Sequence, residues 1–198
     1  MRARGTEPIY PERFDVKALA LTKKQQGSYI YASQYLLEPL PAEKMVFKSQ
    51  YIQYFSHLPS DVPYWVFTYV DPAISSKKDA CNTAIITIAR TADNRIFVID
   101  SIRERGVRPS KLLDMIFSVH RKFKPMHVGI ESVAYQDSIG MNLQDKMKRD
   151  NYFFSIKADT PKNTDSKDNR IRGMQPRFEA MGVWIKKWMS GLESCWCY

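Results

Sequence analysis

Cysteines and long apolar stretches are scarce in this sequence. Its 198 residues include three cysteines, Cys81, Cys195 and Cys197. Their odd number and irregular spacing indicate reduced thiols in a cytoplasm rather than a disulfide framework. No run approaches the roughly 18 apolar residues of a membrane span, and the first residues lack the apolar core of a secretory signal. We therefore expect a cytoplasmic protein with no membrane partner.

Motifs for binding nucleotides or soft metals are also missing. No G-x-x-x-x-G-K-[ST] motif occurs, so the chain has no P-loop with which to use ATP. His57, His120 and His127 are scattered without metal-ligand spacing, and an isolated Cys195-Trp196-Cys197 is too little for a zinc site. The location of His127 near a site stays an alternative. Chemistry in this chain is thus expected from other side chains, above all carboxylates.

The composition is globular and basic. Hydrophobic residues make up 44% of the chain and aromatic residues 13%, which excludes a largely disordered protein. The 30 Lys and Arg residues against 21 Asp and Glu residues give a net charge of +9. Such an excess favours a polyanionic partner, meaning nucleic acid or an anionic membrane surface, and of the two we expect nucleic acid.

Two regions differ in their patterning. Residues 1–62 carry many prolines between short helix-like pieces such as 28–37, and we expect a linker or collar there. Residues 63–198 show the periodicities of a regular domain. Its expected elements are strands at 64–71, 84–89 and 95–100, a helix at 109–123, a strand at 126–131, a helix, a strand at 152–156, a helix around 171–178 broken at Pro176, and a strand at 183–185. Three antiparallel strands followed by βα crossovers predict an α/β fold, a mixed sheet of RNase H-like order flanked by helices.

Two acids end strands of this predicted sheet. Asp71 ends the first strand and is followed at once by Pro72, and Glu131 ends the fourth. Adjacent carboxylates suit Mg²⁺ or Mn²⁺, because hard cations prefer oxygen ligands. Two such ions can stabilise the attacking and leaving oxygens of a phosphodiester. We therefore assign Asp71 and Glu131 as catalytic metal ligands. The alternative is that both are solvated or that they cap turns.

The order of these motifs resembles the large terminase subunit of tailed bacteriophages, from the end of its ATPase region into its nuclease domain. The segments that carry the resemblance are Tyr10–Phe14 with Gln34, Tyr35 and Pro39, then Asp71-Pro72-Ala73 with Asp79, then Gly129-Ile130-Glu131, and finally Lys167–Ile171 with Pro176, Phe178, Glu179 and Gly182. The likeness spans nearly the whole chain, and its specificity lies in the order and spacing of short motifs.

The resemblance implies a function and partners. It implies an RNase H-like endonuclease that cuts concatemeric phage DNA during packaging in the host cytoplasm, with the portal and the small terminase subunit as partners. It also implies a third acid in a downstream Asp-Asp pair, and no such pair occurs before Tyr198. We expect a nuclease domain without its last part. Asp165, Asp168 and Glu193 are possible substitutes, and spacing favours none of them.

Basic residues follow the predicted strands and helices. Phosphate contacts are predicted for Lys77, Lys78, Lys162, Lys167, Arg170 and Arg172, with a solvated basic surface as the alternative. Two other functions remain open. One is a non-catalytic module for DNA binding or assembly, suggested by the missing acid. The other is a different RNase H-like enzyme, such as a junction resolvase or integrase.

Overall fold

A computed structural model describes residues 8, 10–37, 47–72, 82–131, 136–159 and 167–187, with backbone alone at residues 49, 136–138 and 167–169. The chain divides into two compact units. One combines Met1–Tyr54 with Asn163–Tyr198, and the other is Phe55–Lys162. The boundary predicted between residues 62 and 63 stays a prediction. Within the described ranges, no helix has both the length and the apolar character needed to cross a membrane.

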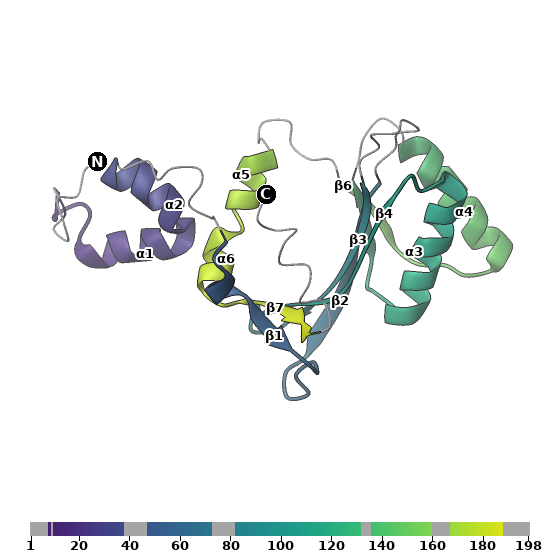
Figure 1. Ribbon diagram of the computed structural model, residues 1–198, viewed down its shortest axis with the longest axis horizontal. Coiled ribbons are helices and arrows are strands. Elements are labelled where there is room, and N and C mark those ends of the chain that lie inside the picture. Colours follow the sequence, from purple (N-terminus) through teal and green to yellow (C-terminus); the bar gives the residue numbers. More distant parts are fainter. Residues whose placement is uncertain are drawn as a thin grey trace. The chain divides into compact units, whose positions relative to one another are not determined.

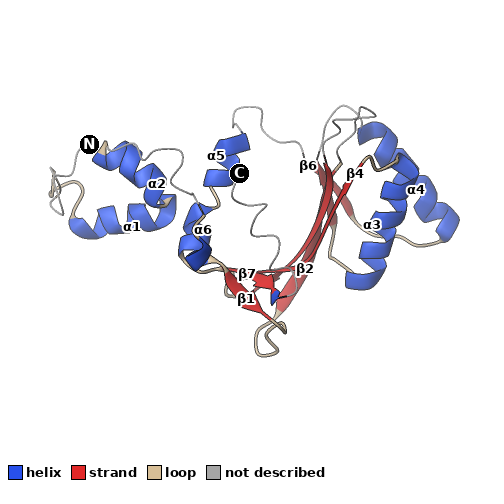
Figure 2. Cartoon of the chain, in the orientation of Figure 1, coloured by secondary structure: helices blue, strands red, loops and turns tan. Residues whose placement is uncertain are grey.

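A mixed sheet forms the centre of the unit Phe55–Lys162 (Figure 2). Its strands are β2 (Tyr64–Asp71), β3 (Asn82–Thr91), β4 (Ile96–Arg105), β5 (Val128–Glu131) and β6 (Ile156–Asp159). They lie in the order β4-β3-β2-β5-β6. The pairs β2–β3 and β3–β4 are antiparallel, whereas β2–β5 and β5–β6 are parallel. The predicted RNase H-like arrangement, three antiparallel strands followed by crossovers, is confirmed.

The β3–β4 hairpin turns where the sequence predicts it. Asn94 adopts a positive φ of 68°, a conformation that asparagine tolerates better than most residues. Its amide donates to the Thr91 carbonyl at 3.0 Å, and the Thr91 amide donates to the Arg95 carbonyl at 3.0 Å. Both strands extend beyond their predicted ends, β3 at both termini and β4 as far as Arg105.

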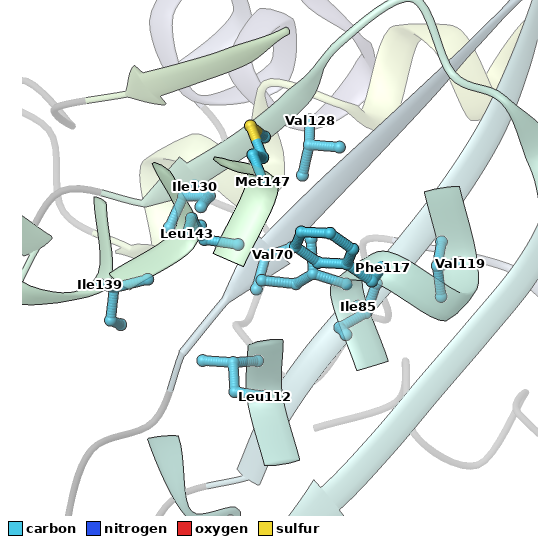
Figure 3. Packing of buried hydrophobic residues seen from close by; sticks show 11 residues of the cluster. Val70, Ile85, Leu112, Phe117, Val119, Val128, Ile130, Ile139, Leu143 and Met147 are labelled. Atoms are coloured by element: carbon cyan, nitrogen blue, oxygen red, sulfur yellow. The ribbon is translucent and has the colours of Figure 1, made fainter. Parts of the chain in front are cut away.

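Helices α3 (Pro109–Phe123) and α4 (Gln136–Asp150) pack on one face of this sheet (Figure 1). The core between them draws Val70, Ile85, Val128 and Ile130 from the strands. The helices supply Leu112, Ile116, Phe117, Val119, Ile139, Leu143 and Met147 (Figure 3). Apolar residues recur on one side of each helix, as a helix with one buried face requires. Because side chains alternate along a strand, the neighbours of the core residues point to the opposite face.

One strand lies later in the chain than predicted. The aromatic stretch 152–156 predicts a strand, but β6 begins at Ile156 and ends at Asp159. Tyr152 and Phe154 pack instead on α3. The Phe154 ring stacks on His120 with centroids 4.2 Å apart, and the Tyr152 hydroxyl lies 2.8 Å from His120 Nδ1. The alternation of aromatic residues at 152–156 therefore serves packing on α3 rather than strand pairing.

The other unit contains short elements. They are α1 (Val16–Gln26), α2 (Ser28–Tyr31), a π-helix η1 (Ala32–Leu36), a 3-10 turn η2 (Ser49–Tyr51), the start of β1 (Gln53–Phe55), α5 (Lys167–Arg172), α6 (Gln175–Glu179) and β7 (Val183–Lys186). The single helix predicted around 171–178 is two helices. Pro176 lies in the first turn of α6, where a proline costs no hydrogen bond.

This unit is held together by contacts between its N-terminal and C-terminal parts. The Ser28 amide donates to the Glu179 carboxylate at 3.2 Å. The Phe47 ring packs edge-on against Phe178, with centroids 4.6 Å apart. Residues more than a hundred positions apart thus form one folded unit.

Candidate active site on the helix-free sheet face

The parallel pairing of β2 with β5 places the two predicted acids side by side. The register pairs Thr68 with Val128, Tyr69 with Gly129, and Val70 with Ile130. The next residue along each strand is Asp71 and Glu131, and each ends its strand. Neighbouring strands lie about 4.8 Å apart, so the two carboxylates can share a ligand.

Both acids project from the face opposite α3 and α4. Val70 and Ile130, directly before them, are buried in the core on the helical side. The period of two along a strand then directs Asp71 and Glu131 to the opposite face, called the helix-free face because no helix described in the unit Phe55–Lys162 lies on it. Asp71 is exposed and Glu131 half-buried, so both can reach a solvent-borne ligand.

A third carboxylate, which the sequence did not reveal, extends this row. Asp159 ends β6 and pairs in register with Glu131, so it lies on the same face. The sequence placed Asp159 in a polar loop because it placed the preceding strand too early. Had the predicted strand ended three residues later, Asp159 would have been identified as a strand-end acid.

Tyr69 lies within the field of all three acids. Its hydroxyl is 3.5 Å from the Asp159 carboxylate, a long hydrogen bond. Partial burial, and then the charges of Asp159, Glu131 and Asp71, raise the pKa of Tyr69 to about 12. The phenol therefore stays protonated at neutral pH and donates to the Asp159 carboxylate.

Gly129 makes room for the Tyr69 ring. A Cβ atom at position 129 would lie 2.8 Å from Tyr69 Cδ2 and 3.2 Å from Cε2. The ring therefore covers the glycine and extends towards β6. The absence of a side chain at one strand position thus lets the tyrosine of the next strand reach Asp159.

Two arginines lie on the same face at the other side of β2. Ala84 pairs with Asp71 and also with Arg103, so Arg103 lies two strands from Asp71, about 10 Å away. Arg105 follows on the same face and donates from Nε to Asn82 Oδ1 at 3.2 Å. Both are exposed. The sequence analysis missed them because it ended this strand at residue 100.

The predicted phosphate-binding residues lie outside the described part of the unit that holds the acids. Lys77, Lys78 and Lys162 lie outside the described residues, and so does the side chain of Lys167. Arg170 and Arg172 belong to the other unit, where the Arg172 guanidinium lies 4.5 Å from the centre of the Tyr29 ring. Their role in binding DNA remains a prediction.

The donor chemistry fits a hard divalent cation. Mg²⁺ is commonly held by one or two carboxylates together with substrate phosphates, and Asp71 and Glu131 can supply the carboxylates. Among the residues that the structure describes, no three His, Cys, Asp or Glu side chains are grouped closely enough to bind a metal.

No protein-family model matches the chain, and no curated protein matches it in sequence. Several solved structures match the chain, among them the following three. The nuclease domain of the P22 large terminase has a TM-score of 0.54 and 13% identity, with 77% of each chain covered. The large terminase nuclease of the thermophilic phage G20c has a TM-score of 0.46 and 12% identity, with 71% of this chain and 74% of that chain covered. Thermus thermophilus RuvC has a TM-score of 0.40 and 13% identity, with 56% of this chain and 80% of that chain covered. The P22 likeness shows that this chain has the RNase H-like fold of a large terminase nuclease domain, the fold that the sequence resemblance predicted.

Proposed function

We propose that this chain is a divalent-metal-dependent endonuclease that cuts double-stranded DNA. The carrying observation is the register of β2 and β5, which sets Asp71 and Glu131 side by side on the open face. When bound there, Mg²⁺ or Mn²⁺ would stabilise negative charge at the phosphate under attack. The carboxylates would fix the ion, and Arg103 and Arg105 lie on the same face to contact neighbouring phosphates.

The biological setting proposed for this activity is genome packaging in a tailed bacteriophage. The order of the sequence motifs and the fold shared with the P22 domain support it. In that setting the substrate is concatemeric phage DNA in the host cytoplasm, and the portal and small terminase subunit are the partners. The basic composition, +9 overall, is consistent with a DNA substrate.

Cleavage of supercoiled plasmid tests the nuclease assignment. With Mn²⁺ we expect nicked and linear products, and we expect Asp71→Asn and Glu131→Gln to reduce cleavage to background. The matched control is Asp145→Asn, which removes an exposed carboxylate from α4. Titration calorimetry with Mn²⁺ gives a second readout, since each of the two site variants should lose metal binding. Equal cleavage by wild type and Asp71→Asn would refute the assignment.

A second candidate is a module that binds DNA without cutting it. It is favoured by the lack, in the described ranges, of a group of three close metal-binding side chains. Such a module would bind plasmid with a strong salt dependence yet leave it intact with Mg²⁺, Mn²⁺ or Ca²⁺. The same plasmid assay therefore separates the two candidates.

A further inference from the structure

A cavity of about 380 Å³ opens on the helix-free face beside the acid pair. Tyr69 and Gly129 line it, each two residues before an acid on its strand. The rest of the wall includes Phe67, Ile86, Ile88, His127, Lys157 and Asp159. The described residues that line it all belong to the unit Phe55–Lys162. Because Tyr69 and Gly129 share their strands and their sheet face with Asp71 and Glu131, the cavity lies next to the proposed active site.

The walls of this cavity combine two kinds of chemistry. Phe67 and His127 pack edge to face, with ring centroids 5.1 Å apart, and Ile86 and Ile88 add aliphatic surface from β3. On the β6 side, Lys157 offers hydrogen-bond donors and Asp159 offers acceptors. A mainly apolar wall with a few convergent polar groups is typical of a small-molecule site.

A nucleobase matches this combination. Its flat faces suit aromatic and aliphatic walls, and its edge carries both donors and acceptors. The volume lies near the lower end of the roughly 300–1,000 Å³ range of ligand pockets. It therefore has room for a nucleobase.

The distance to the acids also fits a nucleotide. Two residues along a strand span about 7 Å, comparable to the separation between a backbone phosphate and the base of its own nucleotide. We propose that the cavity binds one unstacked base of the DNA strand whose phosphate lies at Asp71 and Glu131. This inference rests on the proposed function, and it adds that the duplex opens locally at the site of cutting.

Methyl NMR locates the base directly. The full chain is labelled at isoleucine δ1-methyl groups and titrated in EDTA with dAMP or dTMP, and separately with 2-deoxyribose 5-phosphate. We expect saturable shifts of Ile86 and Ile88 with the nucleotides only. The Ile139 methyl, buried on the helical side, should not move. The proposal would be overturned if the Ile86 and Ile88 methyls did not move, or if they shifted equally with the base-free sugar phosphate. Unmoved methyls are also the result expected if another part of the chain occupies the cavity.

Matched phenylalanine variants supply a second measurement. Phe67→Leu removes an aromatic wall and should weaken nucleotide binding about fivefold or more. Phe153→Leu changes a residue that is 64% exposed and lies outside the cavity, so it should bind nucleotide as wild type does. Equal affinities of the two variants would contradict the assignment of the cavity. Because the titration contains no metal, its result does not depend on whether the chain cuts DNA, so the two proposals can fail separately.

Discussion

Replacing Gly129 with alanine tests how closely β2 and β5 approach on the open face. The new methyl carbon would lie 2.8 Å from Tyr69 Cδ2, closer than real Cβ contacts allow, whereas the next neighbour beyond the ring is the Thr68 carbonyl at 3.8 Å. The Tyr69 ring alone therefore opposes the substitution. Overpacking of this kind costs about 1–3 kcal/mol, against a gain of about 0.4–1 kcal/mol from a less flexible unfolded chain.

The expected result is a lower free energy of unfolding, by about 1–2 kcal/mol. Urea unfolding followed by circular dichroism measures it, as a shift in midpoint at constant slope. Gly140→Ala in α4 is the control, because a Cβ there meets no atom within 4 Å and alanine favours a helix by about 1 kcal/mol. The two glycine variants should shift the midpoint in opposite directions.

A double-mutant cycle with Tyr69→Ala isolates the contact. Without the ring, Gly129→Ala should become neutral or mildly stabilising, which gives a coupling energy of about 2 kcal/mol. If Gly129→Ala destabilises the protein equally in both backgrounds, the ring is not the obstacle. The close packing of Tyr69 over Gly129 would then be refuted.

Three further predictions concern charge, pH and packing. Asp159→Asn removes one of the charges that raise the pKa of Tyr69 to about 12. That pKa, measured by NMR of the labelled ring, should fall but stay above 10, since burial is the larger cause. Burial lowers the pKa of His120 from its ordinary value of 6.5, so the neutral ring is favoured in the folded state. The contribution of His120 to the free energy of unfolding should be fully present above pH 6.5 and should be lost as the pH drops below it. Urea unfolding at pH 7.5 and at pH 5 should therefore differ less in the variant His120→Gln than in the wild type. Phe117→Ala should lower the free energy of unfolding by about 3–5 kcal/mol, whereas Phe153→Ala at an exposed site should change it by less than about 0.5 kcal/mol.

The sequence predicted the elements that have strong periodicity. Strand Tyr64–Asp71 and helix Pro109–Phe123 have the predicted bounds, because each shows an unbroken period and ends at a clear signal. Asp71 followed from the end of the first of these elements, and Glu131 from the end of the predicted strand 126–131, which the structure also ends at Glu131. Their adjacency followed from the fold, since the RNase H-like order makes β2 and β5 neighbours.

Features that depend on contacts between distant segments could not be predicted. The alternation at 152–156 reflects Tyr152 and Phe154 packing on His120, which is a tertiary effect invisible to periodicity. Because the strand was predicted too early, Asp159 was not recognised as a strand-end acid. The place of Gly129 under Tyr69 likewise depends on strand register, and a single sequence does not specify which glycine faces which ring.

The same alternation that builds the core also orients the proposed site. Val70 and Ile130 are anchored on the helical face, at 0% and 4% exposure, and each directly precedes an acid. If β5 slipped by one residue, Glu131 would move to the apolar face and Ile130 to solvent. An unpaired carboxylate in that core would cost several kcal/mol, in addition to the lost burial of the isoleucine. The register that places Glu131 beside Asp71 is therefore enforced by hydrophobic packing on the opposite face. Substitutions that loosen Val70 or Ile130 should consequently disturb the proposed metal site without touching it.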